Sequence, residues 1–284
     1  GGKLEKPIAY GSSVSTSEGV LCIGGDDSQK VYTDVFLLSW NPLDKELSKK
    51  KMPSLPEPVA YGSAVIHKDT VYLVAGQSGK KLDTAHNKVW TFNVSEGEKG
   101  QWKSLPGAPW KSRAFLQVAT QNNGYDDCIY VIGGRQQGAN SVNFFSDVWE
   151  YNLSTKEWRE RKKTPTPIMA GTAIGFSQSH VAVLGGADGS LWGQEDDLKD
   201  DHPGFPKKTY LYHTITNTWI EAGESPANHV TTVPVEWKNS LIIASGEIRP
   251  RVRSAMIWKV TPTPIQKGFG TINYIVLIVY LLIM

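Results

Sequence analysis

The sequence predicts an all-β protein folded as a β-propeller, from its composition, a unit repeated five times and regularly spaced prolines. The 284 residues include 27 Gly, 16 Pro, 10 Trp and 11 Tyr, a composition typical of many short strands joined by turns. No long segment has the apolar spacing of a helix. The net charge is only +2, with Lys and Arg scattered along the chain. The sequence therefore lacks the clustered basic face of a nucleic-acid-binding protein.

One unit recurs five times along the chain. Each copy has a short apolar strand that ends in glycine, followed by a strand in which apolar and polar residues alternate. The closing glycines are Gly25, Gly76, Gly134, Gly186 and Gly246. Their spacing of roughly 50 residues is the period of the kelch repeat. The units predict a kelch-type β-propeller with four-stranded blades at about residues 8–55, 59–106, 113–163, 170–224 and 229–260.

The glycine and proline residues at the ends of the units support this division into blades. Glycine tolerates positive φ where the chain leaves a crowded inner strand. Proline cannot donate to a strand ladder, and proline-rich links occur at residues 53–58, 105–109, 164–167 and 261–264. The fifth unit has no outer strand of its own after Val260, whereas closed propellers remove such edges. We therefore expect five recognisable blades of six, with a poorly covered edge between the first and the last.

The two ends of the sequence look cut, since there is no initiator Met and no signal segment. Residues 271–284 are apolar and uncharged, but 14 residues are fewer than the roughly 20 that span a bilayer. We interpret residues 1–264 as the propeller and 265–284 as a linker and the start of a transmembrane helix; a buried terminal strand is the alternative. Cys22 and Cys128 lie in apolar strands and are interpreted as buried free thiols.

The loop from the second to the third strand leaves every blade on the same face. The residues after the closing glycines should therefore surround one mouth of the central channel: Asp26, Gln77, Arg135, Ala187 and Glu247. Residues 187–208 form the longest loop, and loops of this length are usually functional or disordered. Within it, Trp192 and Phe205 suit the capping of a sugar ring. Its acidic run, which includes Glu195, Asp196 and Asp197, is equally consistent with a solvated face.

The fifth unit carries a more specific motif, made of Gly246, Glu247, Arg249, Pro250 and Arg253. This segment resembles the corresponding part of the N-acetylneuraminate epimerases, also called sialic acid mutarotases, which are six-bladed kelch propellers. Residues 9–13 and 20–26 resemble the last blade of that family, yet they come first here. The chain thus resembles the cyclically permuted branch of the family. Some members of that branch continue into a sodium:solute symporter domain, and residues 269–280 resemble the first membrane helix of such a domain.

The resemblance implies an isomerase that interconverts the α and β anomers of N-acetylneuraminate by acid–base ring opening and closing, without a cofactor. Glu247 suits the proton transfer, because a carboxyl group can donate or accept. Arg253 suits the substrate carboxylate, because its planar fork forms two parallel hydrogen bonds. Further substrate contacts are expected from Arg135, Arg249, Gln77, Asp26 and Trp192. The resemblance also implies a periplasmic protein, tethered to the membrane through its C-terminal segment.

Two alternatives stay open. On spacing alone, Glu247 and Arg253 can form a structural ion pair across their own hairpin. A kelch propeller can also bind a glycan or a protein partner without any chemistry. A sialidase is disfavoured because the Ser-x-Asp-x-Gly-x-Thr-Trp boxes of that class do not recur. A copper sugar oxidase is disfavoured because it needs a Tyr/His/Cys ligand set and both cysteines look structural. The six histidines show no metal-ligand spacing.

Overall fold

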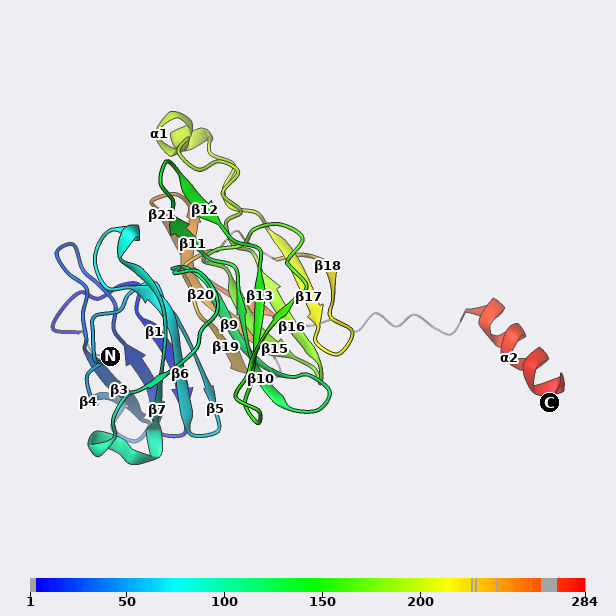
Figure 1. Cartoon of the computed structure of the whole chain (residues 1–284), viewed down its shortest axis with the longest axis horizontal. Helices are drawn as coiled ribbons and strands as arrows, with labels where there is room; N and C mark the ends of the chain where they lie inside the picture. The colour runs from blue at the N-terminus through cyan, green and yellow to red at the C-terminus, as the bar shows by residue number, and fades with distance from the viewer. Residues whose placement is uncertain (1–3, 226, 228, 239, 262–269, 284) are drawn as a thin grey trace.

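The structure, a computed structural model, describes residues 4–283 apart from 226, 228, 239 and 262–269. Five antiparallel sheets follow one another along the chain and form the blades of a propeller (Figure 1). The first blade contains β1 (Ser12–Thr16), β2 (Gly19–Ile23), β3 (Val35–Asn41) and β4 (Glu46–Lys51). The second contains β5 (Ser63–His67), β6 (Thr70–Gln77), β7 (Ala85–Asn93) and β8 (Lys103–Leu105).

The third and fourth blades repeat this order. The third contains β9 (Gln117–Asn122), β10 (Asp127–Ile132), β13 (Val148–Asn152) and β14 (Trp158–Arg161), and carries a separate hairpin of β11 (Arg135–Gln137) and β12 (Val142–Phe144). The fourth contains β15 (Thr172–Phe176), β16 (His180–Leu184), β17 (Lys208–His213) and β18 (Thr218–Glu224). Short helices interrupt the loops at η1 (Leu82–Thr84), η2 (Val94–Lys99), α1 (Glu195–Leu198) and η3 (Lys199–Asp201).

The fifth blade has three strands among the described residues: β19 (Pro234–Trp237), β20 (Ser240–Arg249) and β21 (Val252–Val260). The kelch-type, all-β prediction is therefore confirmed, with four blades of four strands and a fifth of three. The segment after Val260, where we expected no outer strand, falls mainly on residues 262–269, which lie outside the described residues. Within the described part of the chain, β21 pairs only with β20, so the edge that a fourth strand would cover has no partner strand among these residues.

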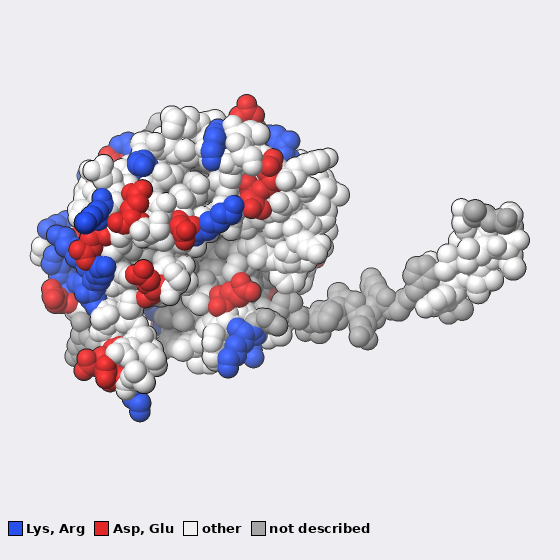
Figure 2. Space-filling model, turned by 90° about the horizontal axis from the view of Figure 1, so that it is seen from below, with Lys and Arg blue, Asp and Glu red and all other residues white. Residues whose placement is uncertain are grey.

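The apolar core lies between the blades, as one cluster at each of the four junctions between consecutive sheets. Leu21 and Leu73 belong to the first cluster, Ile129 to the second, Val183 to the third and Ile243 to the fourth. Alternate side chains of a strand point to opposite faces, so each of the three middle sheets contributes to a cluster on both of its sides. At the end away from α1, Lys and Arg side chains are interspersed with Asp and Glu (Figure 2).

Five equivalent residues form a ring at the start of the inner strands. Each has a positive φ of 55–60°: Tyr10, Tyr61, Phe115, Ala170 and Thr231. Each of the last four donates its backbone N–H to the carbonyl of the ring residue in the preceding blade, at 2.7–2.9 Å. These bonds link each blade to the next one, from the first blade to the fifth. Between the fifth and first blades, the described residues show no bond of this kind, and the Arg253 guanidinium lies 5.1 Å from the Tyr10 ring instead.

The C-terminal helix α2 (Thr271–Ile283) contributes to no blade (Figure 1). Its apolar side chains are all exposed, from 44% at Leu277 to 81% at Leu282. The segment is thus a helix, not the buried terminal strand that was the alternative. Among the described residues, none of the helices combines the length and hydropathy needed to cross a bilayer. The membrane segment stays a prediction.

Gly133→Ala is expected to destabilise the propeller by about 3 kcal/mol. Gly133 has a φ of +60°, and a Cβ there would lie 2.0 Å from the Ile168 carbonyl oxygen in the link to the next blade. Gly107→Ala is the matched control, since its φ is +83° but no atom lies within 4 Å of the added Cβ. The control should cost about 1 kcal/mol. Urea unfolding followed by tryptophan fluorescence measures both, and equal losses would contradict the close-packing explanation.

Candidate active site

A cavity of about 520 Å³ opens above the ring of residues at the start of the inner strands. The residues after the closing glycines are equivalent here, because each forms a β-bridge with the residue just before its blade's ring residue. Three of the five predicted mouth residues line this cavity: Arg135, Ala187 and Glu247. The five positions therefore lie at the same end of the propeller, as predicted. Whether a side chain lines the cavity depends on the residues that it contacts.

Glu247 lies on β20, where the chain bulges as it enters the hairpin with β21. Its backbone pairs with Val230, and its Oε1 accepts a hydrogen bond of 2.5 Å from the backbone N–H of Arg251. Gly246 reaches a φ of +126° beside it, with the Val230 carbonyl 3.1 Å from where a Cβ would be. The turn thus holds the half-buried carboxyl group at the cavity wall.

Arg253 faces Glu247 across the hairpin in register. Among the described residues, however, no ion pair joins the two side chains. The guanidinium of Arg253 lies over the ring of Tyr10, which lines the cavity. The structural ion pair considered from the sequence is therefore absent here. Arg253 is exposed at the edge of the cavity, at the junction of the fifth and first blades.

Arg135 is held between two aromatic rings. Its guanidinium carbon lies 4.2 Å from the ring centroid of Phe115 and 4.4 Å from that of Trp192. Its Nε is buried without a hydrogen-bond partner, and no ion pair of Arg135 occurs within the described residues. Burial lowers the pKa of Arg135 to about 10, while Tyr61 and the carboxylates of Glu195 and Glu247 raise it. The group remains a cation at neutral pH, and an anion in the cavity would complete its bonding.

Three other predicted substrate-binding residues do not line the cavity. Asp26 is 1% exposed, and its Oδ2 accepts hydrogen bonds from the Tyr61 hydroxyl at 2.8 Å and from Lys80 Nζ at 2.5 Å. Gln77 is also buried and donates to the Gly79 carbonyl. Arg249 pairs with Asp200 in the long loop, at 2.6 Å. Asp26 thus contacts the cavity wall from behind through Tyr61, whereas Gln77 contacts its own blade and Arg249 pairs with the long loop.

The long loop, residues 187–208, covers one side of the cavity. Trp192, Glu195, His202 and Phe205 all line it, and Trp192 also packs edge-on against Phe144 with centroids 5.6 Å apart. The acidic run of the loop is exposed at Asp196 and Asp197, as expected of a solvated face, and it also contacts the fifth blade. Two of its carboxylates form ion pairs with arginines of the fifth blade, Asp196 with Arg251 and Asp200 with Arg249.

The sequence interpretation missed the aromatic residues of the cavity floor. The rings of Tyr10 and Tyr61 lie 4.6 Å apart, and those of Tyr61 and Phe115 4.5 Å apart. Burial, followed by the hydrogen bond to Asp26, raises the pKa of Tyr61, so its hydroxyl stays protonated. A signal was present, because Ala-Tyr-Gly-Ser occurs in both of the first two units, at residues 9–12 and 60–63. Such flat apolar surfaces suit the faces of a sugar ring.

The described residues contain no cluster of three or more metal-ligating side chains. Cys22 and Cys128 are free thiols. Cys128 is buried, and burial raises its pKa to about 12. Cys22 is half-buried, so the expectation that both are buried was wrong for this one.

Comparison with known proteins places this architecture among kelch propellers. The Kelch-like protein terF of Aspergillus terreus is 26% identical over 201 residues, which are 69% of this chain and 40% of that protein. The N-acetylneuraminate epimerase of Haemophilus influenzae is 26% identical over 232 residues, and that of Salmonella typhi 23% over 231. These matches cover 72% and 73% of this chain and 57% of each epimerase. The chain thus spans between two fifths and three fifths of the length of these curated relatives.

The solved structure of YjhT has the same fold, with a TM-score of 0.69 and 19% sequence identity. The superposition covers 91% of this chain and 83% of that one. Residues 3–186, more than half of the chain, match the KLHDC2/KLHL20/DRC7 Kelch-repeats domain. Together with the five blades and the glycines that close their second strands, this match shows that the chain belongs to that kelch-repeat family.

Proposed function

We propose that this protein is a mutarotase, which interconverts the α and β anomers of N-acetylneuraminate in the cavity between the ring residues and the long loop. One observation carries the proposal: a carboxyl group, Glu247, and a half-buried cation, Arg135, whose buried Nε has no hydrogen-bond partner, line the same cavity. A sialic acid carries an anomeric hydroxyl and a carboxylate on the same carbon. The two groups therefore match two adjacent features of this substrate. The relatives named N-acetylneuraminate epimerase support the same proposal.

The reaction needs only proton transfer. Glu247 as a carboxylate removes the proton of the anomeric hydroxyl while the bond between the anomeric carbon and the ring oxygen breaks. The protonated Glu247 carboxyl group then gives this proton to the ring oxygen, and the open form holds a carbonyl group at the former anomeric carbon. Rotation of that carbonyl and reclosure on its other face return the proton and give the second anomer. General acid–base catalysis of this kind typically contributes about 10²–10⁴-fold.

The arginines hold the substrate in place for this step. We assign the substrate carboxylate to Arg135, because its guanidinium lines the cavity and a planar fork binds a carboxylate through two bonds. Arg253, at the edge beside Tyr10, is the second cation proposed for the same carboxylate. Trp192 and Phe205 from the long loop and Tyr61 from the floor provide surfaces for the ring faces.

Arg135→Met should weaken binding of N-acetylneuraminate about 10–100-fold, the usual worth of hydrogen bonds to a charged group. Arg135→Lys should recover only part of that loss, because a point charge replaces the fork. Calorimetric titration measures both variants. The methyl ester of the same sugar is the control ligand, since it lacks the carboxylate and should bind all three proteins alike. Unchanged affinity of Arg135→Met for the free acid would reject Arg135 as the carboxylate site.

The second candidate is a propeller that binds a glycan or a protein without chemistry, and the match to the Kelch-like protein terF favours it. The two candidates differ in what they require of Glu247. A binding-only site tolerates a carboxylate on an open rim, whereas catalysis needs the carboxylate in the cavity that is proposed to hold the sugar. Glu247 lines the cavity of about 520 Å³, which supports the catalytic candidate. The cyclic permutation, a periplasmic location and a linked sodium:solute symporter domain stay predictions.

A further inference from the structure

We propose that the long loop, residues 187–208, is a lid over the cavity, and that ion pairs with the fifth blade set its closed position. The four residues of this clasp are Asp196 and Asp200 on the lid and Arg249 and Arg251 on the β20–β21 hairpin. In this account Arg249 is a positioning residue, not a substrate ligand. The effect of the lid on substrate binding rests on the proposed function, whereas the ion pairs of the clasp are tested without any sugar.

The lid belongs to the fourth blade and is fastened to the fifth. It leaves the blade after β16 and returns at β17. Arg249 Nη2 contacts Asp200 Oδ1 at 2.6 Å and Arg249 Nη1 donates to the Lys199 carbonyl at 3.1 Å. Arg251 Nη1 contacts Asp196 Oδ1 at 2.6 Å. Because these bonds all reach from the hairpin to the middle of the lid, they fix the lid across the boundary between the two blades.

The fastened lid completes the surroundings of Arg135. It places Trp192 over the guanidinium, opposite Phe115, and it adds Phe205 and Glu195 to the cavity wall. The backbone N–H of Phe205 also donates to the Ile248 carbonyl in β20, at 3.3 Å. If the lid moves away, Arg135 loses one of its two aromatic neighbours and is hydrated from that side. A substrate carboxylate would then compete with water for the guanidinium.

The clasp is weak enough to open. The side chains of Asp200 and Asp196 are 94% and 79% exposed, and that of Arg251 is 75% exposed. Exposed pairs of this kind shift an equilibrium by a factor of about five or less and are screened by salt. Arg249 is only 24% exposed, so its pair should be the stronger of the two. We therefore expect the clasp to let the lid open for a sugar, with added salt favouring the open state.

The clasp also connects to the acid–base group. Arg251 lies in the turn of the hairpin with a φ of +65°, and its backbone N–H donates to Glu247 Oε1. The residue that holds Asp196 through its side chain thus orients Glu247 through its main chain. Because of this double role, the test uses the other pair, Arg249 and Asp200, which leaves the Glu247 contact untouched.

Hydrogen–deuterium exchange of the full chain tests the clasp without any sugar. At low ionic strength, Asp200→Asn should speed exchange in the peptide that contains Phe205 about threefold to fivefold. Asp200→Arg with Arg249→Asp restores a pair of opposite charge and should return exchange close to that of the unmodified protein. Asp201→Asn is the matched control, because the neighbouring carboxylate takes part in neither ion pair of the clasp. Sodium chloride should speed exchange in the unmodified protein and have little effect on Asp200→Asn.

The same variants separate a positioning role from direct substrate binding by Arg249. If Arg249 is a clasp residue, Asp200→Asn raises the KM for N-acetylneuraminate while kcat is kept, and the charge-reversed pair restores the KM. If Arg249 instead binds the substrate, the charge-reversed pair stays impaired and the proposal is overturned. A rate of hydrogen–deuterium exchange that Asp200→Asn does not change would also overturn the proposed clasp. If Asp200→Asn speeds hydrogen–deuterium exchange but the protein does not convert anomers, the clasp is upheld and only the proposed function is rejected.

Discussion

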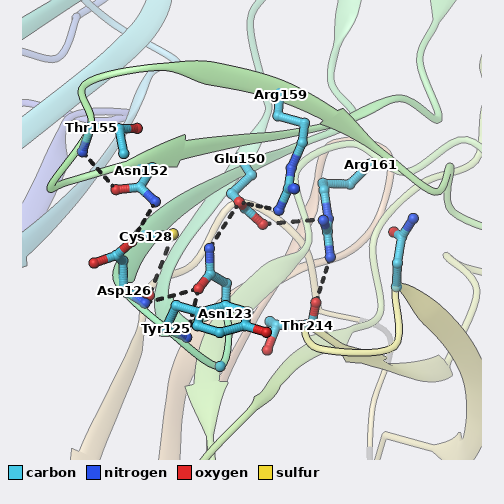
Figure 3. A network of polar contacts seen from close by, with 12 residues as sticks. Asn123, Tyr125, Asp126, Cys128, Glu150, Asn152, Thr155, Arg159, Arg161 and Thr214 are labelled. Carbon is cyan, nitrogen blue, oxygen red and sulfur yellow. Dashed lines mark hydrogen bonds and ion pairs between the residues drawn. The ribbon is translucent and has the colours of Figure 1, made fainter.

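Glu150→Ala is expected to destabilise the propeller by about 3–5 kcal/mol, the usual cost of removing one partner from a buried ion pair. Glu150 is 2% exposed and lies between the third and fourth blades. Its Oε1 accepts hydrogen bonds from Asn123 at 3.2 Å and Arg159 at 2.8 Å. Its Oε2 accepts from Tyr130 at 3.0 Å and lies 3.4 Å from Arg161 Nε (Figure 3).

Most of this loss of stability arises at Arg161, whose side chain is only 9% exposed. This arginine also donates to the Tyr212 hydroxyl at 2.8 Å, across the junction with the fourth blade. Without Glu150 its charge would stay buried with no carboxylate beside it. Glu221→Ala is the control, because the Glu221–Lys208 pair is about half exposed on both sides and should be worth less than about 1 kcal/mol. Urea unfolding curves compare the two, and a loss at Glu150 no larger than the loss at Glu221 would refute the account of this network.

Glu247→Gln should slow anomer exchange about 10²–10⁴-fold, the range for general acid–base catalysis. The amide oxygen can still accept the hydrogen bond from the Arg251 backbone, so the turn and the cavity should keep their shape. Binding of N-acetylneuraminate should therefore change little. NMR exchange rates at saturating sugar, with calorimetric affinities, separate the two effects.

Glu195→Gln is the matched control for this variant, since Glu195 is a second carboxylate that lines the cavity. It should keep most of the activity, because we assign no proton transfer to it. If Glu195→Gln loses the exchange rate and Glu247→Gln keeps it, the acid–base group lies on the lid and the assignment to the β20–β21 hairpin is wrong.

The blades were predictable because their signals are local. Gly134 ends an apolar strand at a point where the backbone has a positive φ. Glycine recurs at the equivalent place in the repeat because it tolerates that conformation. The same logic placed Arg135 and Glu247 at one mouth, since equivalent positions in a repeat occupy equivalent places in space.

The partners of the side chains were less predictable, because they depend on contacts between blades. Asp26 occupies the same place in its unit as Arg135, yet it turns to Tyr61 and Lys80, which belong to the second blade. Arg249 fits a substrate-binding motif, but Asp200, 49 positions away, takes its guanidinium. No pattern within one unit encodes such pairs. The buried Nε of Arg135 is likewise a property of the assembled cavity, since Phe115 and Trp192 come from different segments.

The measurement closest to the central claim is NMR exchange between the two anomers of N-acetylneuraminate, with and without the unmodified chain. We expect the protein to speed exchange well above the rate in buffer. We also expect that the methyl ketoside binds and inhibits but is not converted, because it has no free anomeric hydroxyl. Binding of N-acetylneuraminate without any acceleration of exchange would contradict the account and leave a propeller that only binds its ligand.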